Sequence, residues 1–339
     1  MNGTIGLTTM GLAAAMLVCG ATMVQTAAAD PVVMGYVPSE KGLEATLNAA
    51  DLTPYSHLMI AFANPDASGA WSAGDALACM PDGVGGNVTA AGLRAAVVKA
   101  HAGGQKVLLS IAGGILPSCA GDWAALARSG KRDTLVASLA ALTDTYGFDG
   151  VDVDIESATL TQLVADNDYV PLVAALAKAM TARHKLLTAA TASYVGGMVP
   201  LKALPYFDYV AVMAYDDTDP GHEHSPYAKA RADIDFWLGR GVPKDRLLLG
   251  VPFYGYGYGT YQPTYAYRDL AAQFGDAAAG DVLGQVCATC SYVTYNGPAT
   301  LTQKAQMAKK KAGGVMVWEI SQDAPDGTLI KAVTAGLEN

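Results

Sequence analysis

The chain has 339 residues, of which 51% are hydrophobic and 16% are charged, and its formal net charge at pH 7 is −9. This composition is too apolar for a disordered chain, and the length suits one large domain or two small ones. The negative charge argues against a nucleic-acid partner, because such proteins need a basic surface, and it is compatible with a neutral substrate.

The first 29 residues contain no Asp, Glu, Lys or Arg, and they hold an apolar stretch over about residues 10–18 and close with Ala27-Ala28-Ala29. A short apolar core followed by small residues is typical of a signal peptide. We therefore predict a signal peptide over residues 1–29 and secretion to the extracellular space or the periplasm. An uncleaved anchor is the alternative, but the apolar stretch is shorter than the ~20 residues of a membrane-spanning helix. A lipidated Cys19 is disfavoured because bulky Val18 precedes it.

Eight short apolar runs follow the leader, and their nearly continuous Val, Ile, Leu, Ala and Met content predicts strands covered on both faces. The runs are residues 31–36, 57–64, 105–111, 150–156, 186–192, 209–215, 247–254 and 314–320. Amphipathic stretches that predict helices are residues 91–101, 123–146, 169–184, 228–241 and 301–312. Strands that alternate with helices predict a parallel sheet. Eight such units predict an α/β fold with a single (β/α)8 TIM barrel as one domain over residues 30–339.

Four cysteines, Cys79, Cys119, Cys287 and Cys290, remain after the predicted leader. An even number in an exported protein allows two disulfides. Cys79 and Cys119 follow the second and third strands, whose loops are neighbours on one rim, so a bridge between them is geometrically reasonable. Cys287 and Cys290 can close a local staple. A four-cysteine zinc site is the competing interpretation, but Cys79 and Cys119 do not form a second C-x-x-C pair.

The longest connection, residues 255–300, follows the seventh strand and lies on the rim where barrel enzymes keep their sites. It predicts a Tyr-rich loop after strand seven. Its aromatic rings either form walls for a substrate or pack against one another, and the sequence leaves both accounts open. The tyrosines are Tyr256, Tyr258, Tyr261, Tyr265, Tyr267, Tyr292 and Tyr295.

The fourth strand carries Asp152, Asp154 and Glu156 at every second position. Because strand side chains alternate between faces, the three acids share one face and the Val and Ile residues between them share the other. The apolar face suits the layer under the helices, so the acids are predicted to point into the barrel. Three carboxyls ~6–7 Å apart cannot all ionise there, so a proton is retained and the pKa of Glu156 is raised. A general acid near neutral pH requires such a shift.

Metal binding is the alternative for two segments. The D-x-D-x-D pattern also occurs in calcium loops, but those loops are hydrophilic and broken by glycine, whereas Val and Ile separate the acids here. His222 and His224 could bind zinc, but no further ligand stands at a suitable spacing, which favours a solvated loop. We therefore predict no metal and no cofactor.

The run Asp149-x-x-Asp152-x-Asp154-x-Glu156 resembles the signature of family 18 of the glycoside hydrolases, the chitinases and their relatives. Residues 106–111, 213–216, 250–255 and 313–319 resemble the family's third, sixth, seventh and eighth strands, so the resemblance spans roughly residues 32–333. One departure concerns the third strand, which in the family usually ends S-x-G-G. Ala112 occupies the first of these Gly places, which leaves the geometry of that loop open.

The resemblance implies a chitinase that hydrolyses β-1,4 links between N-acetylglucosamine units with retention of configuration. Glu156 would protonate the glycosidic oxygen, while the N-acetyl oxygen of the substrate attacks C1 and forms an oxazolinium ion. Asp154 would hold the N-acetyl N–H, and Asp152 beneath it would share a proton. Tyr215 would donate its hydroxyl to the N-acetyl carbonyl and hold it in the attacking geometry.

Trp318, at the end of the eighth strand, would form an apolar floor under the sugar. Further candidates for substrate binding are Tyr36, Phe62, Met213 and Asp216. Asp149 and Gly150 are structural members of the motif that organise the entrance to the strand.

The expected partners are chitin or N-acetylglucosamine oligosaccharides, without nucleic acid or membrane, and we expect a monomer. An endo-β-N-acetylglucosaminidase that acts on the chitobiose core of N-glycans is the first alternative, although Trp318 and its context favour a chitinase. A catalytically silent chitin-binding lectin is the second, but such relatives typically lose the glutamate, whereas Glu156 is present.

Overall fold

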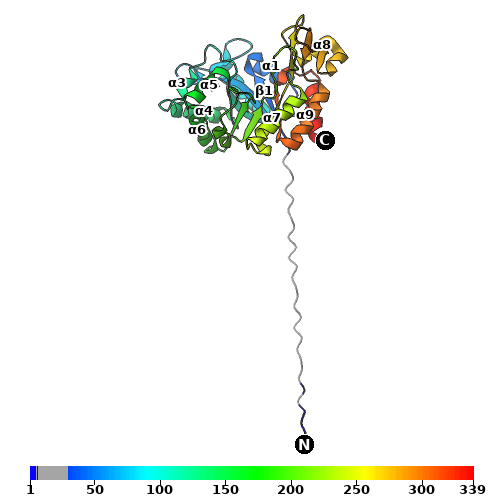
Figure 1. Ribbon diagram of the computed structural model, residues 1–339. Helices are drawn as coiled ribbons and strands as arrows, with labels where there is room; N and C mark the ends of the chain where they lie inside the picture. The colour runs from blue at the N-terminus through cyan, green and yellow to red at the C-terminus, as the bar shows by residue number, and fades with distance from the viewer. Residues whose placement is uncertain (5, 7–29) are drawn as a thin grey trace. The chain divides into compact units, whose positions relative to one another are not determined.

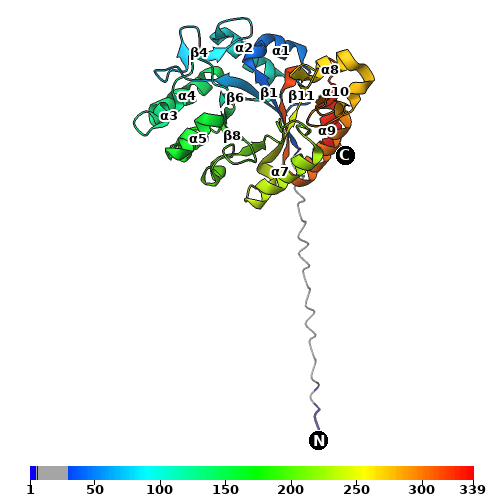
Figure 2. The ribbon, with the colours of Figure 1, turned by 45° about the horizontal axis from the view of Figure 1, so that its top comes forward.

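Eight parallel strands close into a barrel in the computed structural model of the chain (Figures 1 and 2). The structure describes residues 1–4, 6 and 30–339, so the predicted signal peptide lies outside the described residues except for residues 1–4 and 6. Around the barrel the strands follow the order β1, β15, β10, β9, β8, β7, β6 and β2. Their bounds are β1 Val32–Pro38, β2 His57–Ala63, β6 Lys106–Gly113, β7 Gly150–Ile155, β8 Leu186–Thr191, β9 Tyr209–Val212, β10 Leu247–Pro252 and β15 Gly314–Trp318.

Helices lie around the outside of the barrel, as Figure 2 shows, and the predicted (β/α)8 architecture is confirmed. Buried Val, Leu and Ile side chains fill the layer between the strands and these helices. The helices are α1 Leu43–Ala49, α2 Ala90–Ala102, α3 Trp123–Ala127, α4 Arg132–Tyr146, α5 Ser157–Ala165, α6 Tyr169–Thr181, α7 Tyr227–Gly239, α8 Tyr267–Phe274, α9 Pro298–Lys311 and α10 Thr328–Glu338. The predicted helix over residues 123–146 is two helices, because the chain is extended at Arg128.

Six of the predicted strands are too long at their carboxyl ends, and three of these overruns concern residues at the site or in another sheet. Strand β7 ends at Ile155, and Glu156 is the residue before α5. Strand β9 ends at Val212, so Tyr215 lies on an irregular segment beyond it. Tyr254 does not extend β10 but begins β11, a strand of another sheet. Tyr215 and Tyr254 are buried and Glu156 is partly buried, although the backbone at these residues is no longer in the barrel ladder.

The predicted Tyr-rich connection follows the seventh barrel strand, but much of it is regular structure rather than an irregular loop. It contains α8 and a four-stranded antiparallel sheet in the order β12-β11-β14-β13. The strands of this sheet are β11 Tyr254–Tyr258, β12 Thr264–Ala266, β13 Val282–Gly284 and β14 Tyr292–Thr294. A second small sheet of β3 (Ser72–Ala73), β4 (Ala76–Pro81) and β5 (Asn87–Thr89) follows β2.

The acidic residues of β7 point into the barrel, as predicted. Val151, Val153 and Ile155 are buried in the outer apolar layer, so alternation places Asp152 and Asp154 on the inner face. Parallel pairing sets Ser110 of β6 and Thr188 of β8 opposite Asp152. Two neighbouring strands thus bring hydroxyl groups to the level of the first acid.

Two disulfides are present, and both predicted pairings are confirmed. Cys79 of β4 is joined to Cys119 with 5.5 Å between their Cα atoms, which links the segments that follow β2 and β6. Cys287 and Cys290 form a local bridge between β13 and β14.

Among the helices that the structure describes, none combines the length and the apolar character needed to cross a membrane.

Candidate active site

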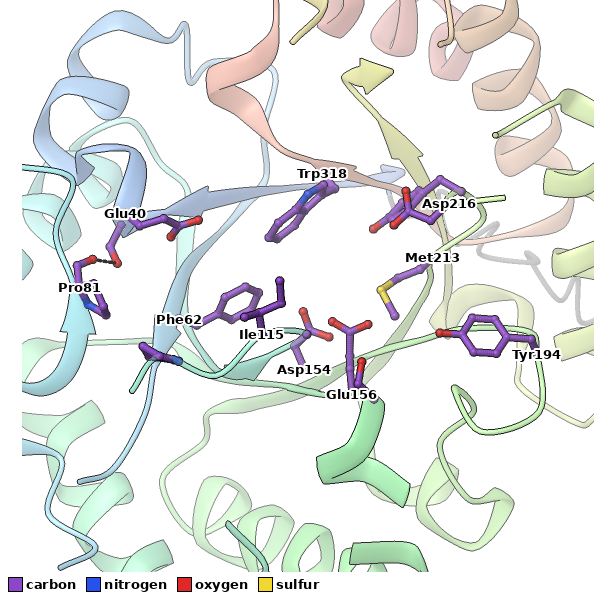
Figure 3. Close-up of a pocket in the computed structure, with 15 residues that line it drawn as sticks. Glu40, Phe62, Pro81, Ile115, Asp154, Glu156, Tyr194, Met213, Asp216 and Trp318 are labelled. Carbon is purple, nitrogen blue, oxygen red and sulfur yellow. Dashed lines mark hydrogen bonds between the residues drawn. The ribbon is translucent and has the colours of Figure 1, made fainter. Parts of the chain in front are cut away.

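A pocket of about 650 Å³ opens at the carboxyl ends of the barrel strands, where Figure 3 shows its lining side chains. Seven of the predicted site residues line it: Phe62, Asp154, Glu156, Met213, Tyr215, Asp216 and Trp318. They come from β2, β7, β15 and the segments just beyond β7 and β9. These elements are far apart in the sequence. The barrel thus brings together most of the residues that the sequence selected.

Asp152 forms the lowest level of the acidic series. It is 1% exposed, and its carboxylate accepts hydrogen bonds from the hydroxyls of Tyr36 (2.7 Å), Ser110 (2.7 Å) and Thr188 (2.6 Å). Burial raises the pKa of Asp152, while these three donors oppose the rise because they stabilise the carboxylate. Asp152 is therefore held in place as an acceptor below the pocket.

Asp154 lies on the pocket floor above Asp152. Its pKa is well above the usual value, because the group is buried and lies near the carboxyls of Glu156 and Asp152. A hydrogen bond with Glu156 raises the Asp154 pKa further, so a proton is shared between these two carboxyls. Its Oδ1 atom is buried without a hydrogen-bond partner in the protein. That oxygen therefore has an unused capacity to accept a hydrogen bond.

Glu156 stands at the top of the series, beside the opening. Burial raises its pKa to about 7, with the nearby carboxyl of Asp216 as the next cause, while the hydrogen bond with Asp154 opposes the rise. The predicted upward shift at Glu156 is thus found, but the strongest shift of the series falls on Asp154. Gly114 leaves space for the acid, since a Cβ there would lie 2.9 Å from Glu156 Oε1.

Tyr215 faces the same space and is 8% exposed. Its hydroxyl has a weak acceptor, Met316 Sδ at 3.8 Å, and can therefore turn to a better one. Burial keeps the pKa of Tyr215 well above its usual value, with the neighbouring acids adding to the effect, so the hydroxyl stays a donor.

Asp216 follows Tyr215 in a left-handed conformation with φ of 67°. Its Oδ1 accepts hydrogen bonds from the hydroxyls of Tyr254 and Tyr256, the latter at 3.0 Å. Burial raises the pKa of Asp216 above its usual value, and the two tyrosine hydroxyls oppose that rise. The Asp216 carboxyl is thus fixed at a position from which it raises the pKa of Glu156.

Aromatic rings form the other side of the pocket. Trp318 stacks on Phe62 with 5.7 Å between ring centroids and meets Tyr36 edge-on at 5.2 Å. Trp318 and Phe62 line the pocket, as predicted. Tyr36 lies below it, 1% exposed and bonded to Asp152, so it orients that acid rather than forming a pocket wall.

Asp149 and Gly150 lie at the start of β7, at the opposite end of the strand from Glu156. Asp149 Oδ2 accepts the backbone N–H of Val107 at 2.7 Å and lies 2.8 Å from His101 Nε2. A Cβ on Gly150 would lie 2.3 Å from the carbonyl oxygen of Leu186, so a larger residue has no room there. Their place at the strand entrance agrees with a structural role.

Tyrosines of the inserted sheet pack mostly within it. Tyr258 stacks on Tyr292 with centroids 4.5 Å apart, and Tyr267 lies against Tyr295. Of the seven tyrosines in residues 255–300, none is among the described residues that line the pocket, although Tyr256 reaches Asp216. The packing account is therefore the better description of this region.

The two histidines of the H-x-H segment do not converge. His224 is fully buried, with its ring 5.4 Å from that of Tyr254 and 5.3 Å from that of Tyr256. His222 is exposed and lies with Asp217 and Asp219, whose ligand atoms fall within 4.8 Å of one another.

Several pocket residues were missed by sequence reasoning, although a signal for them existed. Most of them follow the carboxyl end of a barrel strand, which is where barrel enzymes place their sites. Tyr194, for example, follows β8, and in Figure 3 its hydroxyl points towards the opening beside Glu156. The missed residues are Ser39, Glu40, Pro81, Gly114, Ile115, Pro117, Ser157 and Tyr194.

The open question about Ala112 is also answered. Ala112 adopts φ of 74°, a left-handed conformation that costs a non-glycine residue about 1–2 kcal/mol. It is fully buried, and its carbonyl oxygen accepts a hydrogen bond from Asn64 Nδ2 at 3.0 Å. The loop thus has the backbone conformation that glycine favours, although the residue is alanine.

Comparison with known proteins identifies the family. A sequence model of the family described as "Glycosyl hydrolases family 18" matches residues 32–323. Chitinase 63 from Streptomyces plicatus is 30% identical over 239 residues, which cover 56% of this chain and 39% of that protein. Chitinase C from Streptomyces lividans is 29% identical over 228 residues, which cover 53% of this chain and 36% of that protein. The chain thus spans about two fifths of the length of these curated relatives.

Solved structures show the same fold over nearly the whole chain. The GH18 chitinase ChiB from the chitin utilization locus of Flavobacterium johnsoniae is 27% identical with a TM-score of 0.74, covering 91% of this chain and 94% of that one. A chitinase from Bacteroides thetaiotaomicron has a TM-score of 0.74 and 24% identity, covering 91% of this chain and 97% of that one.

Proposed function

The chain belongs to family 18 of the glycosyl hydrolases, and from this premise we propose that it is a chitinase that cleaves β-1,4 links between N-acetylglucosamine units with retention of configuration. The observation that carries the proposal is the hydrogen-bonded pair of Asp154 and Glu156 on the floor of a pocket that Tyr215 also faces. The names of the related proteins support the choice of chitin as the substrate.

In the first step Glu156 gives its proton to the glycosidic oxygen as the bond from that oxygen to C1 breaks. The acetamide oxygen of the same sugar attacks C1, so the electron pair lost to the leaving group is replaced from within the substrate. Asp154 accepts the acetamide N–H, a role supported by its Oδ1 atom, which has no hydrogen-bond partner in the protein and would turn towards the sugar. Tyr215 donates to the acetamide oxygen and holds it near C1.

In the second step Glu156 acts as a base. It takes a proton from a water molecule, and the oxygen of that water attacks C1 on the face that the leaving group vacated. The oxazolinium ring opens, the acetamide is restored, and Glu156 regains the proton with which it began. Two inversions at C1 give net retention.

The pH dependence follows from the state of Glu156. Because the first step needs Glu156 protonated and its pKa is about 7, kcat/KM should be highest below pH 7 and fall about tenfold per pH unit well above it. Asp216→Asn removes a carboxyl that raises the Glu156 pKa, so the alkaline limb should move to lower pH. Initial rates on a chromogenic N-acetylglucosamine trimer between pH 4 and 9 measure both. A flat profile from pH 6 to 9 would contradict this assignment.

A product profile tests the proposed function. We expect hydrolysis of N-acetylglucosamine oligomers, with the β-anomer as the initial product when the reaction is followed by NMR before mutarotation. Initial α-anomer would rule out retention. Release of intact glycans from a glycoprotein, without cleavage of the oligomers, would instead identify an endo-β-N-acetylglucosaminidase. Oligomer binding without either activity would identify a lectin.

We further propose that the protein is exported. The uncharged, apolar leader over residues 1–29 supports this, and so do the two disulfides, since such bonds persist in oxidising compartments. The amino-terminal sequence of the protein recovered from culture medium or periplasm tests the proposal. A start near Asp30 is expected, and an intact leader on cytoplasmic protein would contradict it.

A further inference from the structure

A buried lysine lies behind the pocket and has no part in the mechanism above. Lys304 of α9 is completely buried. Its ammonium donates to the carbonyl oxygen of Ser225 (2.6 Å), to the hydroxyl of Ser225 (2.7 Å) and to the side-chain oxygen of Asn296 (2.6 Å). All three acceptors are neutral, and they satisfy the three donors that an ammonium has.

If Lys304 served only to fill space in the core, this arrangement would be unfavourable in free energy. An ammonium removed from water loses its hydration, so burial lowers the pKa of Lys304 to about 7. An apolar side chain of similar length would fill the same volume without this cost. The hydrogen bonds of the ammonium indicate a second role, which is to orient the Ser225 hydroxyl.

Ser225 connects Lys304 to the active site. Because the ammonium can only donate, the Ser225 hydroxyl accepts from it and directs its own proton elsewhere. That proton goes to the carbonyl oxygen of Ala214, 2.7 Å away. Ala214 is the residue directly before Tyr215, so the hydrogen bond fixes the peptide that carries the tyrosine.

The segment that is held in this way begins where the strand ladder ends, since the N–H of Met213 still donates to the carbonyl oxygen of Thr191 at 2.8 Å. Strand β9 ends at Val212, and Asp216 is in a left-handed conformation. Asn296 adds a second connection, since its Nδ2 donates to the carbonyl oxygen of Ser225 at 2.9 Å. Contacts from α9 and from the residues after β14 thus reach the carbonyl oxygen of Ala214 through Ser225.

We propose that Lys304 is a positioning residue, whose ammonium fixes Tyr215 through the Ser225 hydroxyl and the Ala214 carbonyl. The inference rests on the proposed function, because it assigns Tyr215 to the acetamide of the substrate. It predicts that removal of the ammonium costs turnover through Tyr215 and not through general loss of structure.

A double-mutant cycle measures this dependence. Lys304→Met should lower kcat on N-acetylglucosamine oligomers by roughly 10–100-fold with little change in KM, because the displaced hydroxyl serves the reaction more than binding. In a Tyr215→Phe background the same change should lower kcat by less than about threefold, since the hydroxyl that it positions is already gone. Equal losses in both backgrounds, or no loss in the wild-type background, would overturn the inference.

A second variant guards against poor folding of Lys304→Met, which leaves buried acceptors unpaired. Ser225→Ala removes the connecting hydroxyl and keeps the lysine. It should lower kcat about tenfold, and this loss too should disappear in the Tyr215→Phe background. A loss that persists there would count against the connection.

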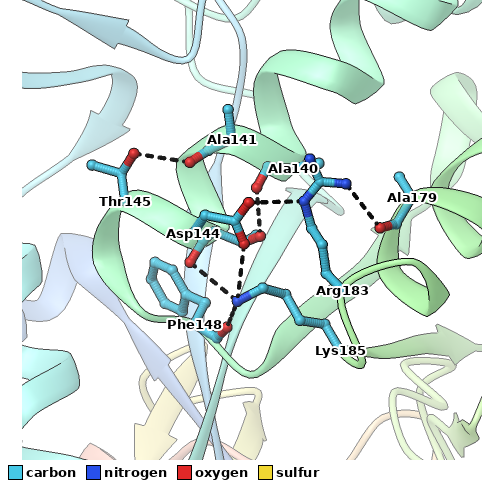
Figure 4. Close-up of polar contacts among 9 residues, drawn as sticks. Ala140, Ala141, Asp144, Thr145, Phe148, Ala179, Arg183 and Lys185 are labelled. Atoms are coloured by element: carbon cyan, nitrogen blue, oxygen red, sulfur yellow. Dashed lines mark hydrogen bonds and ion pairs between the residues drawn. The ribbon is translucent and has the colours of Figure 1, made fainter.

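A matched control is present at the other end of the barrel. Lys185, drawn in Figure 4, is also largely buried and donates to the carbonyl oxygen of Phe148 at 2.5 Å, just before β7. It also lies 3.5 Å from the carboxylate of Asp144. Lys185→Met should lower the melting temperature but change kcat by less than about threefold. A control that loses as much turnover as Lys304→Met would show that any buried lysine matters equally.

Crystal structures of the wild type and of Lys304→Met separate this inference from the proposed function, because they need no activity. The Tyr215 hydroxyl should move by about 1 Å or more while Trp318 stays in place. If the wild type proves inactive but Tyr215 moves, the proposed function fails and the positioning holds. If the wild type is active and Tyr215 is unmoved in the variant, the positioning fails alone.

Discussion

Glu156→Gln is expected to lower kcat on N-acetylglucosamine oligomers by roughly 10²–10⁴-fold, because a carboxamide has no acidic proton for the leaving oxygen. The side chain keeps its size, and its amide can still bond to Asp154. The fold and the affinity for a trimer should therefore be retained. Initial rates, a melting curve and titration calorimetry with the trimer measure the three quantities.

A suitable control for this variant is Glu44→Gln, which makes the same chemical change on the exposed side of α1. It should change kcat by less than about twofold, as surface substitutions usually do. Near-normal turnover by Glu156→Gln would remove that residue from the role of acid. A lost melting transition would mean that its effect is structural.

Tyr215→Phe is expected to lower kcat by roughly 10–1000-fold, through the loss of one hydrogen bond that matters most in the transition state. In the free protein the hydroxyl has Met316 Sδ at 3.8 Å as a weak acceptor, so its removal leaves little unsatisfied. Stability should thus change little, and KM should change less than kcat. Steady-state kinetics beside thermal unfolding tests this split.

Tyr227→Phe provides the matched comparison, because Tyr227 is an exposed tyrosine on α7. Its kcat should equal that of the wild type. If Tyr215→Phe also behaves like the wild type, the ring of Tyr215 only packs, and the acetamide must be held by another group.

The barrel was predictable from sequence because its strands are covered on both faces and are therefore apolar throughout. The carboxyl ends of the strands were not predictable, because side chains stay buried beyond the last residue that pairs with a neighbouring strand. Glu156 and Tyr215 both lie beyond the last paired residue, although both were predicted to belong to strands. Alternation along β7 nevertheless gave the correct inward face for Asp152 and Asp154, since it depends only on the local backbone.

The inserted sheet was missed for a different reason. Residues 254–258 read Tyr-Gly-Tyr-Gly-Tyr, an alternation with the period of a strand, but glycine argued for a loop. The structure explains one of these glycines, because a Cβ on Gly255 would lie 2.4 Å from the carbonyl oxygen of Thr294. The glycines serve close approach of neighbouring strands, which a sequence alone does not reveal.

Lys304 could have been noticed from its spacing. It lies three residues after Leu301 and four before Ala308, on the buried face of α9, whereas Lys309 and Lys310 fall on the exposed face. A charged residue on an apolar helical face indicates a buried partner. Its partners at Ser225 and Asn296 come from distant segments, and only the folded chain brings them together.

The Cys79–Cys119 bridge has a consequence for affinity. Pro81 and Pro117, each two residues from one of these cysteines, both line the pocket. The covalent link and the two pyrrolidine rings restrict that wall before any sugar arrives, so little chain freedom remains to be lost when a ligand docks. Preorganisation of this edge therefore lets a few contacts with a flexible oligosaccharide yield more net binding free energy than the same contacts on a loose loop.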